Sequence, residues 1–180
     1  VEEYSKDAYA LQFLGRILSG SKKSPFYKVL VEERKLAPAG GGGGGGGGRG
    51  GFGGGSSVSA NQRSREVAGT FQITVRPFPT VKLGDVESAI QEAFARFEKD
   101  GFSVQDVERQ KAGLEYRSYS SLASIFGKAT QLGNANAMTG NPDFMAIDLA
   151  NTMKVTKDDV LRVYNTYIKG QKYALLSTVP

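Results

Sequence analysis

A tract of glycine divides this chain into two unequal parts. Residues 40–55 contain 14 of the chain's 24 glycines and are interrupted only by Arg49 and Phe52. Such a tract buries no apolar side chains that would offset the entropy lost on ordering, so it predicts a mobile surface loop. The flanking parts must therefore supply the hydrophobic core. We expect residues 1–180 to form a single domain that carries residues 39–57 as a flexible glycine-rich insertion.

The chain contains no histidine and no cysteine among its 180 residues. It therefore lacks the two best zinc ligands, the usual general base near neutral pH and the most reactive nucleophile. We predict no catalytic residue, no cofactor-binding residue and no metal ligand in this chain. The formal charge of +5 is modest, and basic residues alternate with acidic ones, which disfavours a dedicated nucleic-acid binder. No apolar run approaches the ~20 residues of a membrane span.

The part of the chain around the glycine tract predicts two helices followed by a β-hairpin. Apolar residues recur at helical spacing in both predicted helices, and Ser24 is placed to cap the second, with Pro25 at its first position. Alternating apolar residues then predict strands. The elements expected are helices at 6–20 and 24–36 and strands at 58–60 and 67–75, joined by a turn at 61–64.

The second half predicts mainly helices and then a closing strand. Ser103 with Asp106 predicts a capping box, and Thr156 is placed to cap the last helix. The elements expected are helices at 84–99, 103–132, 141–149 and 156–170 and a strand at 172–179, with Leu114, Leu122, Ile125 and Phe126 on the buried side of the longest helix. The order of elements indicates an α+β fold, a two-layer sandwich in which helices pack on one face of a mainly antiparallel sheet.

Charged residues offer only weak candidates for a site. Glu32 and Glu33, like Asp158 and Asp159, are neighbours on a helix whose side chains diverge by about 100°, so neither pair forms a converging acid pair. Four basic residues on the predicted long helix could bind an acidic partner or form an ordinary solvated face, and we favour the solvated face. These residues are Arg109, Lys111, Arg117 and Lys128.

Three segments resemble the repeat of the pitrilysin- and insulinase-type zinc metallopeptidases, the peptidase M16 family. They are Ser24–Ala37, Gly101–Lys111 and Val155–Val160, and they occur in the order that the family has. The resemblance extends over nearly the whole chain outside the glycine tract, and it is closest to bacterial members with several repeats in one chain. It implies the metallopeptidase-like two-layer fold, with its first strands missing from this chain.

The resemblance also implies a role. In the family, one repeat binds zinc through a His-x-x-Glu-His helix and a later Glu, and a second repeat of similar fold lacks these groups. A chain without histidine resembles the non-catalytic repeat, which forms part of the peptide-binding chamber and packs against the catalytic repeat, so zinc is expected in that partner and peptide is the expected substrate. Some such repeats use an Arg and a Tyr to polarise the scissile carbonyl, but the matching positions here are Val31 and Pro38, which cannot donate a hydrogen bond.

Two alternatives stay open. The chain could be a structural assembly domain of an inactive peptidase-like protein, or a module that contacts RNA through the RGG-like sequence around Arg49. We favour the non-catalytic domain of a zinc metalloendopeptidase, inactive as this piece, with no nucleic-acid or membrane partner. The compartment is open, and a periplasmic or secreted bacterial location is what the resemblance suggests.

Overall fold

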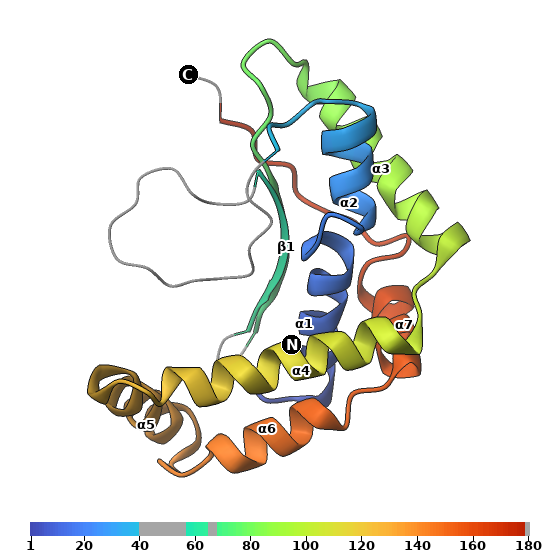
Figure 1. The fold of residues 1–180 in the computed structure, drawn as a ribbon. Coiled ribbons are helices and arrows are strands. Elements are labelled where there is room, and N and C mark those ends of the chain that lie inside the picture. The colour runs from blue at the N-terminus through green and yellow to red at the C-terminus, as the bar shows by residue number, and fades with distance from the viewer. Residues whose placement is uncertain (40–56, 65–67, 179–180) are drawn as a thin grey trace.

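The computed structural model describes residues 1–39, 57–64 and 68–178 (Figure 1). The predictions about the glycine-rich insertion and the RGG-like sequence fall outside these residues. In the part of the chain that the structure describes, no helix is both long and apolar enough to cross a membrane.

The fold is α+β, as predicted: helices pack on one side of a two-stranded antiparallel sheet (Figure 1). The described elements are α1 (Lys6–Ser19), α2 (Pro25–Tyr27), the π-helix η1 (Lys28–Glu33), β1 (Val58–Arg63), β2 (Thr70–Val75), α3 (Leu83–Asp100), α4 (Val104–Ser121), α5 (Ile125–Thr139), α6 (Met145–Met153) and α7 (Lys157–Tyr167).

Helix α1 lies against strand β1, and the two are in close backbone contact. Val58 and Ala60 of β1 are buried and pair with Val75 and Ile73 of β2. The Ala60 N–H donates to the Ser19 hydroxyl at 2.8 Å. A Cβ on Gly15 would lie 2.5 Å from the Ala60 carbonyl oxygen, so only glycine allows the helix to approach this strand so closely.

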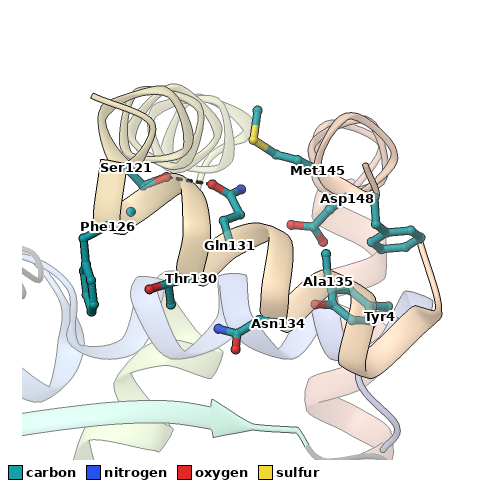
Figure 2. A pocket seen from close by; sticks show the side chains of 11 residues that line it. Tyr4, Ser121, Phe126, Thr130, Gln131, Asn134, Ala135, Met145 and Asp148 are labelled. Carbon is teal, nitrogen blue, oxygen red and sulfur yellow. Dashed lines mark hydrogen bonds between the residues drawn. The ribbon is translucent and has the colours of Figure 1, made fainter. Parts of the chain in front are cut away.

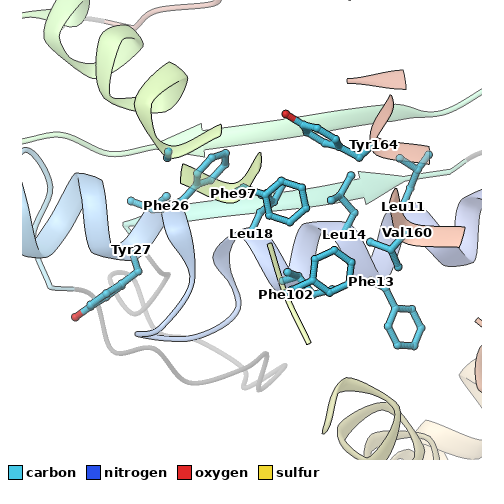
Figure 3. Packing of buried hydrophobic residues seen from close by; sticks show 14 of the residues in the cluster. Leu11, Phe13, Leu14, Leu18, Phe26, Tyr27, Phe97, Phe102, Val160 and Tyr164 are labelled. Atoms are coloured by element: carbon cyan, nitrogen blue, oxygen red, sulfur yellow. The ribbon is translucent and has the colours of Figure 1, made fainter. Parts of the chain in front are cut away.

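The hydrophobic core lies between α1, the α2–η1 segment, α3 and α7 (Figure 3). Phe13, Leu14 and Leu18 of α1 have no exposed surface. The Phe97 ring meets the Tyr164 ring edge to face at a centroid distance of 4.9 Å, which joins α3 to α7. The apolar stripe predicted for residues 6–20 is therefore the centre of the core.

The helix caps predicted at Ser103 and Thr156 are confirmed. The Ser103 hydroxyl accepts the Asp106 N–H at 3.1 Å, and the Asp106 carboxylate accepts the Ser103 N–H at 2.9 Å. Thr156 and Asp159 form the same reciprocal pair at the start of α7. Asp thus completes a capping box in the third position, where Glu is more usual.

The segment after Ser24 differs from its prediction as one regular helix. The α-helix α2 is only three residues long, and the π-helix η1 follows it directly. At the end of η1 the Arg34 N–H donates to the Val29 carbonyl at 2.9 Å. Lys35 then adopts a left-handed φ of 50°, which ends the helical geometry before residue 36. The Ser24 hydroxyl donates to the Ser21 carbonyl and makes no cap bond to the helix, so the predicted side-chain cap is wrong.

The turn predicted at residues 61–64 is also wrong. Strand β1 continues through Arg63, which pairs with Thr70 of β2. The polar residues of this segment, which favoured a turn, instead form the end of the strand.

The single helix predicted over residues 103–132 is interrupted between α4 and α5. The Ser124 hydroxyl accepts the Gly127 N–H at 2.9 Å and caps a new helix. The prediction that Ile125 and Phe126 are buried is wrong, since they are 88% and 81% exposed, because no other described element covers this turn of α5. The next helix, α6, begins at Met145 and not at residue 141, since residues 142–144 form a turn.

The closing strand predicted at residues 172–179 is absent from its described part, residues 172–178. A strand needs a partner edge, and this segment pairs with neither described strand. It contacts α3 instead, where the Tyr173 hydroxyl donates to Glu87 at 2.6 Å. Leu175 and Leu176 are exposed.

Candidate functional site

The two positions that match the family's Arg and Tyr offer no polar side chain. Val31 lies in η1 and is buried in the core cluster. Pro38 is exposed, and its carbonyl accepts a hydrogen bond from the Ser57 hydroxyl at 2.5 Å. In the chain as described, no three His, Cys, Asp or Glu side chains gather in a way that could hold a metal ion.

The adjacent carboxylates have structural roles. Glu33 pairs with Arg96 across to α3. Asp159 caps α7 and pairs with Lys6 of α1 at 2.8 Å. Burial raises the pKa of Asp159, but hydrogen bonds from Lys6 and Thr156 outweigh it and hold the pKa below its usual value. Glu32 and Asp158, the sequence neighbours of Glu33 and Asp159, are exposed to solvent, so neither pair of carboxylates converges on a common point.

One cleft of the described structure has a volume of about 590 Å³ and lies between α1, α4, α6 and the end of β1. Helix α1 contributes Tyr9, Gln12 and Arg16, and α4 contributes Leu114, Arg117 and Ser118. The α1 residues are three and four positions apart, and Arg117 and Ser118 are three and four positions after Leu114, so each helix presents one face to the cleft. We call this the arginine cleft, after Arg16, Arg117 and Arg63 at the end of β1.

Arg16 and Arg117 face the same space from two helices. Burial lowers the pKa of the Arg16 guanidinium, and repulsion from Arg117 lowers it further. Sequence reasoning did not select Arg16, although a charged residue inside the apolar stripe of residues 9–18 was the signal that could have found it.

The four basic residues that were predicted on one long helix have different surroundings in the structure. Arg109 pairs with Asp106 at 3.1 Å and Lys111 with Glu108 at 2.8 Å, both on the same helix. Lys128 lies exposed on α5. The solvated-face interpretation therefore fits Arg109 and Lys128. It does not fit Lys111, whose side chain is only 15% exposed, or Arg117, which lines the cleft.

A hydrogen bond between Tyr9 and Asp148 crosses the cleft from α1 to α6. The Tyr9 hydroxyl donates to the Asp148 Oδ1 at 2.7 Å. Burial raises the pKa of Tyr9 above its ordinary value, and the Asp148 carboxylate raises it further. At neutral pH the phenol is therefore a hydrogen-bond donor and not a base.

A second cleft, of about 410 Å³, adjoins the first and shares Tyr4 and Asp148 with it (Figure 2). Its apolar walls come from Phe126, Phe144 and Met145, and we call it the aromatic cleft. The Tyr4 and Phe144 rings meet edge to face at 4.8 Å. Tyr4 adopts a left-handed φ of 61°, a strained conformation for a non-glycine residue, at the junction of the two clefts.

The two clefts are lined by groups that can bind a ligand. The described lining holds guanidinium, amide, hydroxyl and aromatic groups and the carboxylates of Glu3 and Asp148, of which Asp148 accepts a hydrogen bond from Tyr9. Such groups can hold an anionic group beside an apolar one. No nucleophile paired with a base is present in the lining of either cleft.

Comparison with known protein families decides which family the chain belongs to. The family described as the peptidase M16 inactive domain matches residues 2–114. The chain is a member of the peptidase M16 inactive-domain family. The match covers α1 to α3 and the first part of α4, so it includes the α1 and β1 residues of the arginine cleft and ends before Arg117.

Solved structures share the fold of this M16 inactive domain. A protease from Helicobacter pylori superposes with a TM-score of 0.71 at 18% identity, over 93% of this chain and 36% of that chain. The inactive peptidase domain of a Bordetella parapertussis protein named as a zinc protease superposes with a TM-score of 0.71 at 17% identity. The superposition covers 93% of this chain and 80% of the Bordetella chain. A peptidase M16 inactive domain from Pseudomonas fluorescens superposes with a TM-score of 0.66 at 17% identity. The superposition covers 94% of this chain and 35% of the Pseudomonas chain.

The M16 inactive domain therefore spans about a third of the Helicobacter and Pseudomonas chains and four fifths of the Bordetella chain. A search of curated proteins found no match. The recognition made from the three sequence segments is confirmed, as is the α+β fold that it implied.

Proposed function

We propose that this M16 inactive domain is the non-catalytic domain of a zinc metalloendopeptidase. In this proposal it forms part of a peptide-binding chamber and packs against a catalytic repeat that carries the His-x-x-Glu-His helix and the zinc ion. Its contribution is geometric: it confines an extended peptide and limits access of water, while the partner repeat performs metal-assisted hydrolysis.

One observation carries the proposal. The family match is to an inactive peptidase domain, and the whole sequence contains no histidine that could ligate a catalytic zinc. The burial of Val31 and the exposed, donor-free ring of Pro38 support a role without direct contact to the scissile carbonyl. The arginine and aromatic clefts support a role in binding.

We propose further that residues 1–180 are one domain and that residues 39–57 form an insertion within it. The flanks of the glycine tract support this proposal, because Ser57 donates to the Pro38 carbonyl and the Phe78 N–H donates to the Leu36 carbonyl at 2.9 Å. The helical segment before the tract is thus held directly beside the hairpin that follows it.

The test uses the complete protein that contains this chain, assayed with internally quenched peptides and with zinc present. We expect hydrolysis by the complete protein and a large loss of hydrolysis when residues 1–180 are removed, with restoration when the domain is added back as a separate chain. Hydrolysis that is unchanged by removal would contradict the chamber role. A complete protein that neither binds zinc nor cleaves peptides would favour the structural assembly alternative.

A further inference from the structure

We propose that the arginine cleft binds the carboxylate groups of an acidic peptide segment, held by Arg16 and Arg117. The inference rests on the proposed function only in taking the ligand to be a peptide. It goes further by naming the chemical class of that peptide and the residues that recognise it.

The first observation is the distribution of ion pairs. Four described arginines are paired with carboxylates within this chain, namely Arg34, Arg96, Arg109 and Arg162. Of the other arginines in the described residues, Arg16, Arg63 and Arg117 all line the arginine cleft, and Arg76 lies outside it. The unpaired guanidinium groups are thus concentrated in one cavity.

The second observation is the environment of the two helical arginines. Arg16 and Arg117 are both half-buried, and they repel each other across the cleft. A guanidinium out of bulk water is stabilised by a carboxylate that accepts two of its N–H bonds. A bound carboxylate would therefore relieve a repulsion that the free cleft contains.

The acidic residues of the cleft do not already fill this role. Glu3 and Asp148 are part of the lining, but neither forms an ion pair with an arginine in the described structure. Asp148 accepts the Tyr9 hydroxyl instead. Three guanidinium groups against two carboxylates leave the cleft with a formal excess of positive charge.

The third observation is the size and continuation of the cleft. Its volume of about 590 Å³ suits a multi-atom ligand better than a single small ion. It adjoins the aromatic cleft, with which it shares Tyr4 and Asp148 and whose walls include Phe126, Phe144 and Met145. An acidic side chain followed by an apolar one would place a carboxylate among the arginines and an apolar group among the aromatic rings.

The experiment measures the binding of a fluorescein-labelled peptide, Ser-Glu-Glu-Phe-Glu-Leu-Ser, to residues 1–180 by fluorescence anisotropy. The control peptide carries Gln at each Glu position. We expect the Glu peptide to bind at least about tenfold more tightly, since charge-assisted hydrogen bonds are lost with the carboxylates. Its affinity should fall as salt is raised, because the attraction is electrostatic.

Two substitutions and a matched control locate the site. We expect Arg117→Gln and Arg16→Gln each to lower the affinity for the Glu peptide by about tenfold or more. Arg76→Gln removes the same charge from an exposed, unpaired position outside the cleft and should leave the affinity unchanged. Arg117→Gln removes the repulsion on Arg16, so urea unfolding should show that this variant is no less stable than the parent chain.

Equal binding of the Glu and Gln peptides would overturn the proposal, as would an Arg117→Gln variant that binds like the parent chain. Single-stranded RNA that binds more tightly than the Glu peptide and loses affinity in the same variants would assign the cleft to phosphate groups and overturn it too. The assay needs neither zinc nor a catalytic repeat. A negative result here therefore contradicts this inference without deciding the outcome of the hydrolysis test.

Discussion

Tyr9 shows how one side chain can connect two distant parts of the sequence. Its hydroxyl reaches Asp148, 139 positions later, at a distance of 2.7 Å, and so ties α1 to α6. We expect Tyr9→Phe to lower the free energy of unfolding by about 1–2 kcal/mol, because Asp148 loses a hydrogen-bond donor in a partly buried site. Urea unfolding measures this difference.

Tyr116→Phe is the matched control for this substitution. Tyr116 is 73% exposed on α4 and makes no hydrogen bond in the described structure, so its variant should match the parent chain. Equal stability of the Tyr9 and Tyr116 variants would show that the bond between α1 and α6 contributes nothing.

Two tyrosines make stability depend on alkaline pH. The pKa values of Tyr9 and Tyr164 are raised above the ordinary 10.0, chiefly by burial and then by hydrogen bonds to Asp148 and Glu98. The folded state holds these protons more tightly than the unfolded state does. The stabilisation is therefore complete below pH 10 and declines as the pH rises through and above 10.

We expect urea midpoints measured between about pH 8 and pH 11 to fall less steeply for a Tyr9→Phe, Tyr164→Phe double variant than for the parent chain. A Tyr116→Phe variant should follow the parent chain. Lysines titrate equally in the parent chain and the double variant, so they do not affect the comparison. If the urea midpoints of both fell equally with pH, the link between stability and these two tyrosines would be contradicted.

At the scale of elements, the contact between α1 and β1 depends on Gly15. A Cβ there would lie 2.5 Å from the Ala60 carbonyl oxygen, which is backbone and cannot rotate away. We expect Gly15→Ala to destabilise the domain by about 2 kcal/mol or more, because α1 must move away from the strand. Thermal unfolding followed by circular dichroism measures the effect.

Gly113→Ala is a control for which we expect the opposite effect on stability. Nothing lies within 4 Å of a Cβ at Gly113, which is inside α4. Alanine there should stabilise the helix by about 0.5–1 kcal/mol. A Gly15→Ala variant as stable as the parent chain would show that α1 and β1 are not in the close contact described.

The elements that could be predicted from sequence are those with local signals. The capping box at Ser103, the cap at Thr156 and the apolar stripe of α1 were predicted because their partners lie within one or two helical turns. The break at Ser124 also has a local signal, a hydroxyl three residues before Gly127, but the apolar pair Ile125 and Phe126 concealed it. Apolar character indicates burial only where another element covers it.

The missed strand and the missed site both depend on distant contacts. Residues 172–178 have strand-like composition, but strand pairing requires an edge that sequence spacing does not reveal. The arginine cleft requires Arg16 and Arg117, 101 positions apart, to face each other, and helical spacing on α1 or α4 alone does not show this. The absence of polar donors at Val31 and Pro38, by contrast, was readable from residue type once the family was recognised.

At the scale of the whole molecule, the glycine tract should be dispensable for folding. Its flanks are already joined by the hydrogen bond from Ser57 to the Pro38 carbonyl. Replacing residues 40–56 with a Gly-Gly linker should leave the fold intact and raise stability by up to about 2 kcal/mol, since a shorter loop costs less entropy to close. Urea unfolding and circular dichroism of the shortened chain check this, and an unfolded product would contradict the insertion proposal.

We propose that this domain binds and positions a peptide while a partner repeat performs the chemistry, so that the catalytic metal belongs to that other repeat. The most direct test is metal analysis of purified residues 1–180 after exposure to excess zinc and gel filtration. We predict no stoichiometric zinc, because the chain has no histidine or cysteine to hold the ion. One tightly bound zinc ion per chain would contradict the claim.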